Sequence, residues 1–260
     1  MPKGISLHIG LNNIDPGHYS DVFPVLKGPE FDAEDMRAIA GKMGFEPEKL
    51  ISPEATREAV LSRISQAAQA LEAGDIFLIT FSGHGSNLPG KEKDGKDETW
   101  CMYDGEVSDN ELFDRYCEFR EDVRILVVSD SCHSGTVIEL HGNRVVKSLP
   151  DETARYTYRS NQAFYDNIRT TLRERSKEDL KASIKLLAAC QDNQAAEDDD
   201  FNSLYTRELK SVWQHGDFQG NYQEFHNALL ARFDNSLQTP NYEMLGKTNT
   251  KYDNQKPFTV

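Results

Sequence analysis

The sequence has no run of about 20 consecutive apolar residues, so it predicts no membrane-spanning helix. Its N-terminal segment also lacks the succession of basic, apolar and small residues that marks a secretory signal, and we expect a cytoplasmic location. Basic residues are few, because 29 Lys and Arg stand against 43 Asp and Glu, a formal net charge of −14. This charge repels nucleic acid and anionic membranes, so we expect neither as a partner.

Cysteine is scarce in this chain of 260 residues, which has only Cys101, Cys117, Cys132 and Cys190. The four are widely spaced and include no CxxC pair, so neither a disulfide framework nor a zinc site is expected. A reducing compartment then keeps the thiols free. We expect Cys101 and Cys117 to be packing residues, which leaves the other thiols as candidate nucleophiles.

Short apolar runs alternate with helical patterns along the chain. Buried strands are predicted at residues 5–11, 75–81, 123–129 and 184–189, with a short strand at 100–103. Helices are predicted at residues 30–43, 56–71, 109–119, 203–215 and 222–233. Such alternation is typical of an α/β protein in which helices cover both faces of a parallel sheet. We predict a three-layer α/β/α sandwich with a mostly parallel sheet of roughly six strands.

Two stretches show little apolar periodicity. Residues 141–180 are rich in Arg and Lys, and we interpret them as a mobile connection with one helix near residues 161–175. The residues after 233 form a polar tail in which no further element is predicted.

Two turns rich in glycine and serine follow buried strands directly. The first, Phe-Ser-Gly-His-Gly, contains His84, and the second, Asp-Ser-Cys-His-Ser-Gly, contains Cys132. Because ligands of parallel sheets bind beyond the carboxyl ends of the strands, both side chains are placed for chemistry. We predict Cys132 as nucleophile, His84 as proton shuttle, and the backbone N–H groups of Gly85 and Cys132 as an oxyanion hole. A lone buried Cys or His is usually inert, but two at strand ends are a poor fit to that interpretation.

These paired motifs resemble those of metacaspases and their prokaryotic relatives, the orthocaspases, within the caspase-like superfamily (peptidase C14). The separation of 48 residues between His84 and Cys132 agrees with the roughly 50 residues found in caspase-type proteases. True caspases carry Gln-Ala-Cys where this chain has Asp-Ser-Cys. The resemblance resumes at Leu-Ala-Ala-Cys-Gln-Asp-Asn-Gln (187–194). It implies one caspase-like domain over residues 1–260, made of a large-subunit-like region (1–140), the basic connection (141–180) and a small-subunit-like region (181–260).

The resemblance implies an acidic specificity pocket built from Asp32, Ser82 and Asp130. Two carboxylates beside the nucleophile would bind a basic side chain and repel an acidic one, so we expect cleavage after Arg, then Lys, and none after Asp. The alternative for Asp32 is a carboxylate that the dipole of its helix favours.

Many metacaspases need calcium, and the family's calcium ligands would correspond here to Asp97, Asp109, Asn110 and Glu139. Asn110 stands where an Asp is common, which lowers the charge of such a site. An acidic surface loop is the simpler account, so calcium is expected to be an optional activator, and no cofactor is needed for the chemistry.

The resemblance therefore implies a cysteine endopeptidase that acts on exposed Arg or Lys of polypeptides through an acyl-enzyme. It also implies latency until a partner protein or small signal molecule activates the enzyme, self-cleavage within residues 141–180, and a role in bacterial cell death or antiviral defence. The alternative is a non-catalytic ligand-sensing or scaffold member of the fold, against which the intact His84 and Cys132 argue. An asparaginyl or aspartyl endopeptidase is disfavoured by the acidic pocket.

Overall fold

The computed structural model describes residues 1–20, 23–90, 95–132, 145–190, 196–233 and 238–260. Its main sheet has six strands in the order β11-β9-β7-β3-β1-β2. Strand β11 runs antiparallel to β9, and every other neighbouring pair is parallel. The strands are β1 (Gly4–Gly10), β2 (Glu46–Ile51), β3 (Ile76–Ser82), β7 (Arg124–Asp130), β9 (Ser183–Ala188) and β11 (Asn241–Gly246). The predicted mostly parallel, six-stranded α/β architecture is confirmed.

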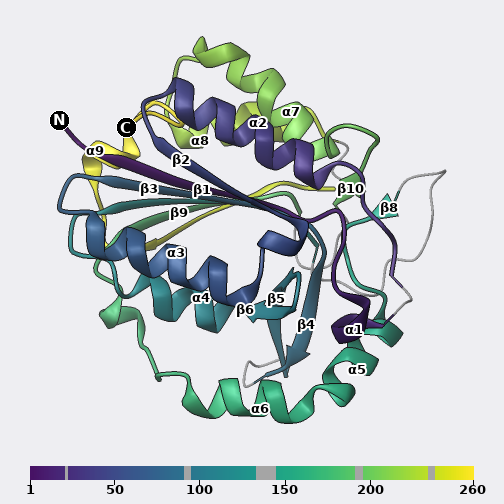
Figure 1. The fold of residues 1–260 in the computed structure, drawn as a ribbon. Helices are drawn as coiled ribbons and strands as arrows, with labels where there is room; N and C mark the ends of the chain where they lie inside the picture. Colours follow the sequence, from purple (N-terminus) through teal and green to yellow (C-terminus); the bar gives the residue numbers. More distant parts are fainter. Residues whose placement is uncertain (21–22, 91–94, 133–144, 191–195, 234–237) are drawn as a thin grey trace.

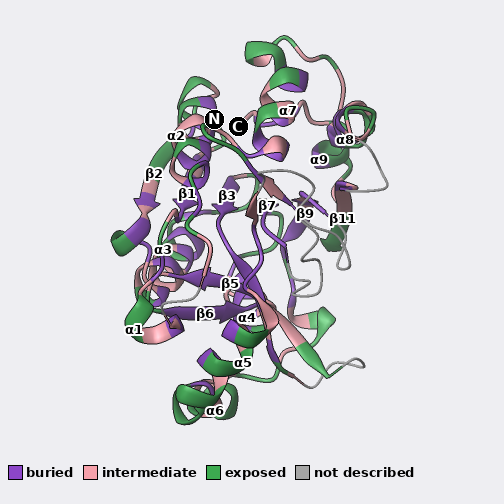
Figure 2. Ribbon diagram, turned by 90° about the vertical axis from the view of Figure 1, so that its right-hand side faces the viewer, coloured by how far each residue is buried: buried purple, intermediate pink, exposed green. Residues whose placement is uncertain are grey.

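Helices cover both faces of this sheet (Figure 1). One layer contains α3 (Arg57–Ala70) and α4 (Asp109–Tyr116), and the other contains α2 (Pro29–Lys42), α7 (Leu204–Trp213) and α8 (Tyr222–Leu230). Two hydrophobic clusters follow from this layering, one on each side of the sheet. The central strands are buried on both faces, as Figure 2 shows, which explains why β3 is apolar along nearly its whole length.

Local sequence signals account for several helix boundaries. Thr56 caps α3 by accepting a hydrogen bond from the backbone N–H of Ala59. Ser108 and Glu111 form both hydrogen bonds of a capping box at the start of α4, as the sequence predicts. These caps satisfy backbone N–H groups that a helix leaves without intrahelical partners.

A second, three-stranded antiparallel sheet follows the turn that contains His84. It comprises β4 (Gly85–Pro89), β5 (Lys96–Met102) and β6 (Gly105–Ser108). Trp100 of β5 stacks on Phe81 of β3, with ring centroids 4.6 Å apart, and so fastens this sheet to the main one. The short strand predicted at residues 100–103 is therefore part of a longer strand that begins earlier.

The helix predicted near residues 161–175 is confirmed, but the described part of residues 141–180 contains more structure than the single predicted helix. This part holds the two-residue strand β8 (Val145–Val146) and the helices α5 (Asp151–Ser160) and α6 (Gln162–Thr171). Buried threonine and tyrosine side chains anchor the two helices, and Thr157 Oγ1 donates a hydrogen bond to Tyr19 O. Polar anchors of this kind leave no apolar stripe for a sequence pattern to detect.

The C-terminal region also contains more structure than the sequence pattern predicts. Strand β11 extends the main sheet, and α9 (Thr250–Asp253) follows it. Tyr252 and Phe258 are buried in the second hydrophobic cluster. The remaining short elements are α1 (Pro16–Tyr19), η1 (Ser52–Glu54), η2 (Lys177–Asp179), β10 (Glu197–Asp198) and η3 (Gln214–Gly216).

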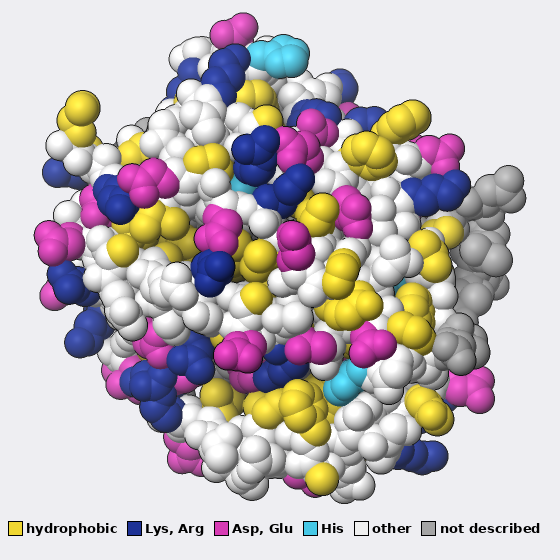
Figure 3. Space-filling view, viewed as in Figure 1, with side chains coloured by type: hydrophobic (Ala, Val, Ile, Leu, Met, Phe, Trp, Pro, Cys, Tyr) yellow, Lys and Arg dark blue, Asp and Glu magenta, His cyan; other side chains and the backbone are white. Residues whose placement is uncertain are grey.

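The distribution of surface charge and the lengths of the helices are relevant to nucleic-acid and membrane partners. In Figure 3 the described acidic and basic side chains are interspersed over the visible face rather than separated by sign. Among the described residues, no helix has both the length and the apolar character needed to cross a membrane.

Candidate active site

The register of two adjacent strands brings His84 and Cys132 to one edge of the main sheet. Strands β3 and β7 are parallel neighbours, and Ser82 pairs with Asp130 at their carboxyl ends. Each motif residue follows two positions later, so neither depends on a long loop for its placement. Both side chains are buried.

His84 is held by a backbone carbonyl from a distant segment. Its Nε2 lies 2.7 Å from Pro24 O, an acceptor only, so this nitrogen carries the proton. Nδ1 is then the unprotonated nitrogen, and within the described part of the chain it has no hydrogen-bond partner. Burial lowers the pKa of His84 to about 4, so the imidazole is neutral at neutral pH and can accept a proton. No sequence signal identifies Pro24, because its role depends only on where its carbonyl lies.

Acidification should destabilise the protein partly through His84. Its pKa is about 4 in the folded protein against 6.5 for the free side chain, so between these values only the unfolded chain takes up the proton. The contribution of His84 to the free energy of unfolding is therefore largest above about pH 6.5, and it decreases as the pH falls from about 6.5 to about 4. When the pH is lowered from about 7 to about 5, the free energy of unfolding of the wild type should fall by about 2 kcal/mol more than that of a His84→Asn variant.

Urea unfolding of both proteins at the two pH values measures this difference. His8 is a second buried histidine with a pKa lowered by burial to about 3, but it is present in both proteins and its contribution cancels. Equal losses in the two proteins would contradict a buried neutral imidazole at position 84.

The sulfur of Cys132 lies among groups from the small-subunit-like region. Its Sγ accepts a hydrogen bond of 2.9 Å from the backbone N–H of Ala196 and lies 3.3 Å from Cys190 Sγ. Ala196 was not identified from the sequence, because any residue could supply that N–H.

One carbonyl of the chain itself lies at the predicted oxyanion hole. The oxygen of Lys147 accepts hydrogen bonds of 3.0 Å from the backbone N–H groups of both Gly85 and Cys132. Two converging amides are the arrangement that stabilises the oxyanion of a tetrahedral intermediate. The structure thus places both predicted donors around one peptide carbonyl.

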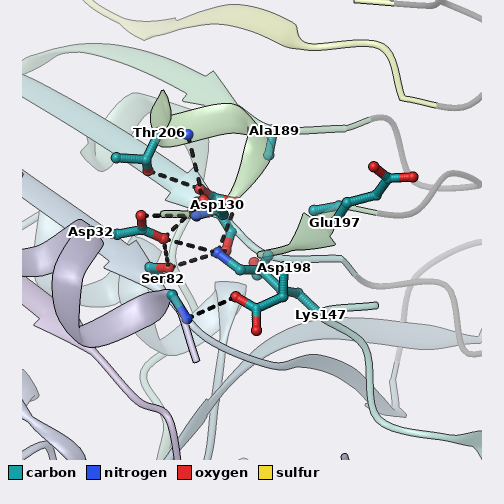
Figure 4. Close-up of polar contacts among 12 residues, drawn as sticks. Asp32, Ser82, Asp130, Lys147, Ala189, Glu197, Asp198 and Thr206 are labelled. Carbon is teal, nitrogen blue, oxygen red and sulfur yellow. Dashed lines mark hydrogen bonds and ion pairs between the residues drawn. The ribbon is translucent and has the colours of Figure 1, made fainter. Parts of the chain in front are cut away.

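The side chain of Lys147 extends from that carbonyl into the predicted acidic pocket (Figure 4). Its Nζ lies 2.7 Å from Ser82 Oγ, 3.2 Å from Asp32 Oδ2 and 3.1 Å from Asp130 Oδ1. Burial alone would lower the pKa of Lys147, but the carboxylates of Asp130 and Asp32 outweigh it and raise this pKa. All three pocket residues named from the sequence therefore converge on one ammonium group.

The floor of the pocket is the start of α7. The sequence predicted this helix at residues 203–215 but not its part in the pocket. Ser203 N donates to Asp32 Oδ1 at 3.1 Å, and Thr206 Oγ1 donates to Asp130 Oδ2 at 2.9 Å. The positive end of a helix favours carboxylates at this position. Burial raises the pKa of Asp130, and the Lys147 ammonium opposes that shift. These donors hold the two carboxylates close together, which their mutual repulsion would otherwise resist.

The backbone on both sides of Lys147 is bound as an added strand. Residues 145–149, which we call the inserted segment, include β8, and β8 pairs antiparallel with β10. Lys147 N donates to Ala196 O at 3.0 Å, and Leu149 N donates to Gly85 O at 2.9 Å. Extended peptides commonly bind by strand addition of this kind. The Lys147–Ser148 peptide bond therefore begins at the carbonyl that the Gly85 and Cys132 amides hold.

The residues suggested for calcium are only partly brought together. Asp97 and Asn110 line one cavity of about 820 Å³ near α4 and α6, whereas Asp109 is not part of its lining. Glu139 lies outside the described residues. Across the ranges that the structure describes, no three His, Cys, Asp or Glu side chains are grouped to hold a metal ion. The described residues therefore do not by themselves form the calcium site, and no step below is derived through a metal.

Comparison with known proteins agrees with this geometry. The family model of the caspase domain, Peptidase C14, matches residues 11–252. The chain belongs to this family. The resemblance seen in the two motifs is therefore confirmed. A crystal structure of protein GSU0716 from Geobacter sulfurreducens superimposes on this caspase domain with a TM-score of 0.92 and 44% identity, covering 100% of this chain and 99% of that one.

Curated relatives of this caspase domain are more distant. Metacaspase-1 of Arabidopsis thaliana is 32% identical over 133 residues, which cover 44% of this chain and 36% of that protein. Metacaspase III c of Phaeodactylum tricornutum is 30% identical, covering 52% of this chain and 44% of that protein. The chain thus spans less than half the length of these relatives. Another relative, from Trypanosoma brucei brucei, is named inactive metacaspase-4 and is 25% identical over 55% of this chain.

Proposed function

We propose that this caspase domain is a cysteine endopeptidase that cleaves polypeptides after Lys or Arg. One observation carries the proposal: a lysine of the chain has its carbonyl at the Gly85 and Cys132 amides while its ammonium lies between Asp32 and Asp130. A scaffold has no need for a carbonyl site and a charged side-chain pocket at that spacing. A peptidase needs both, because they orient the bond next to the residue that they recognise.

The residues present support a two-stage thiol mechanism. The proton of Cys132 passes to His84 Nδ1, and the sulfur attacks the carbonyl carbon of the substrate lysine, whose oxygen becomes an oxyanion held by the two amides. As the oxyanion collapses, the C–N bond breaks and His84 returns the proton to the leaving nitrogen. A water molecule then gives a proton to His84 and attacks the thioester. Release of the carboxylic acid product returns the proton to Cys132 and restores the thiol.

Specificity follows from the charges of the pocket. Ser82 and the two carboxylates give an ammonium three oxygen acceptors, matching its three N–H donors. A guanidinium could bind the same carboxylates bidentately, and our prediction that Arg is cleaved faster than Lys rests on that. Peptides matched except for a terminal Arg, Lys or Asp decide the order, and comparable turnover of the Asp peptide would contradict an acidic pocket.

The inserted segment also supports the predicted latency. Lys147 fills the pocket completely, so a second polypeptide can enter only when this segment leaves or is cut. Because the segment is bound in the orientation of a substrate, the enzyme's own first cut is expected between Lys147 and Ser148. Removal of this segment is then the event that a partner protein or small signal molecule would control, in bacterial cell death or antiviral defence.

Self-cleavage at this bond is directly measurable. We expect intact-mass analysis of the purified chain to show fragments ending at Lys147 and beginning at Ser148. A Lys147→Ala variant should lose this cut, because neither carboxylate then has a cation to bind, whereas Lys147→Arg should keep it. Incubation with calcium and with a chelator, in parallel, tests whether calcium accelerates the cut.

Two outcomes would count against self-cleavage. A cut at the same bond in a Cys132→Ala chain would point to another protease in the preparation. A cut in Lys147→Ala at an undiminished rate would show that the pocket does not select the bond.

A further inference from the structure

Cys190 places a second thiol against the catalytic sulfur. Strand β9 pairs with β7 in parallel, with Ala188 opposite Ser129. Just beyond this pair, Ala189 N donates a hydrogen bond of 2.8 Å to Ser129 O, so the segments that follow the two strands begin side by side. Cys190 Sγ consequently lies 3.3 Å from Cys132 Sγ, and it also donates a hydrogen bond of 3.4 Å to Ser131 O. The proximity of the two sulfurs is thus set by sheet register rather than by a flexible loop.

The hydrolytic mechanism does not use Cys190. The proton shuttle, the oxyanion donors and the specificity pocket come from other residues, and a small apolar or hydroxyl side chain would fill its place. A disulfide requires a sulfur separation near 2.0 Å, so the two sulfurs need to approach by only about 1.3 Å. Side-chain torsions of this pair can supply that movement because both residues lie beyond the paired strand ends.

The two thiols differ in a way that gives them separate roles. Cys132 Sγ accepts the backbone N–H of Ala196 and is the nucleophile of the proposed peptidase. The pKa of Cys190 is raised well above its usual value by its contact with Cys132 and by burial, so it stays a protonated thiol. Cys132 is therefore the sulfur that reacts first with an oxidant, and Cys190 is the one that resolves the product.

We propose that Cys132 and Cys190 are the reactive and resolving thiols of a reversible disulfide formed by hydrogen peroxide. The Cys132 thiol gives up its proton as its sulfur attacks one peroxide oxygen, the O–O bond breaks, and the hydroxide that leaves takes up that proton to become water. The resulting sulfenic acid is attacked by the sulfur of Cys190; its hydroxide leaves and takes the Cys190 proton as a second water. Two thiols and one peroxide thus give one disulfide and two waters.

Such a disulfide makes the Cys132 sulfur unavailable for catalysis and also protects it from further oxidation. As long as the disulfide exists, Cys132 cannot form an acyl-enzyme, and it cannot be oxidised further to the irreversible sulfinic and sulfonic acids. A dithiol reductant regenerates both thiols by exchange. The inactivation rests on the proposed peptidase function, but the disulfide itself does not.

Peptide mass mapping of the peroxide-treated full-length chain, alkylated under denaturing conditions, tests the bond. We expect one cross-linked species that joins the peptides containing Cys132 and Cys190 and lacks two hydrogens relative to their sum. Dithiothreitol should abolish it and restore peptide hydrolysis. Absence of this species, with Cys132 recovered as sulfinic or sulfonic acid, would overturn the proposal.

A Cys190→Ser variant separates the resolving role from simple packing, with Cys117→Ser as a control because Cys117 is buried to the same 8% exposure. Each variant is compared with its own untreated activity. We expect dithiothreitol to restore hydrolysis in the wild type and in Cys117→Ser but not in Cys190→Ser, whose Cys132 over-oxidises. Equal recovery in all three would overturn the proposal. If the wild type forms the cross-link but hydrolyses no peptide, the proposed peptidase function alone is contradicted. If Cys190→Ser does not fold, the peptide mapping of the wild type decides whether the disulfide forms.

Discussion

Replacing Cys132 with alanine is expected to lower hydrolysis of a fluorogenic peptide ending in Lys by at least about 10⁴-fold. Removing the nucleophile of a triad enzyme costs about 10⁶ in kcat, and the rate that remains comes from the oxyanion hole and substrate binding. The same remnant is expected here, because the Gly85 amide and the acidic pocket do not depend on the sulfur. Initial rates at saturating peptide give kcat for both proteins.

A Cys101→Ala variant is the matched control, since Cys101 is as fully buried as Cys132 but lies in the core near α3 and α4. It should lose stability and keep its kcat. Activity of the Cys132→Ala protein within about tenfold of the wild type would reject Cys132 as nucleophile. Mass analysis shows whether the wild type has been cut after Lys147. If the cut protein still hydrolyses no peptide, the separated segment still occupies the pocket.

An Asp130→Asn variant should lose about 10²- to 10⁴-fold in kcat/KM for a peptide ending in Lys, because removing one partner of a buried ion pair costs about 3–5 kcal/mol. The ammonium would then keep Ser82 and Asp32 but lose its 3.1 Å partner. A peptide ending in norleucine has no charge to bind, so its kcat/KM should change little. The ratio of the two substrates is therefore the informative measurement.

Asp114→Asn is the control for this comparison. Asp114 is a buried carboxylate that pairs with Arg173 and Arg175 on the outer side of α4, away from the pocket. Its replacement should lower stability and leave the Lys to norleucine ratio unchanged. The same ratio in Asp130→Asn and in the wild type would show that Asp130 does not select the basic side chain.

The fold and the placement of His84 and Cys132 beyond neighbouring strand ends were predictable because their signals are local. A strand buried on both faces is a short apolar run, and β3 and β7 have that form. His84 and Cys132 each follow such a run by two residues, so recognising the two strands as parallel was enough to bring them together. The capping box of α4 is also a local signal, since its two residues are three apart in the sequence.

Strands β2 and β11 and the helix α5 were not identified from the sequence, for a physical reason. Strand β2 lies at one edge of the sheet and β11 at the other, and most of their residues are at least partly exposed, so neither is an apolar run. Helix α5 is held by buried threonine side chains, and the partner of one of them, Tyr19 O, is far away in the chain. Tertiary contacts, rather than propensity, decide such elements.

The sequence by itself determined the family of folds and the placement of Ser82, His84, Asp130 and Cys132 at the carboxyl ends of two neighbouring strands, because each lies within two residues of a strand end. Asp32, which lies in α2, was named only from the family resemblance. The tertiary structure alone decided what occupies that site and what supports it. The Pro24 carbonyl, the Ala196 amide and carbonyl, the start of α7 and the inserted segment all come from parts of the chain separated by tens of residues. Backbone groups carry no sequence signature, and a lysine among many basic residues becomes a pocket ligand only when the fold closes around it.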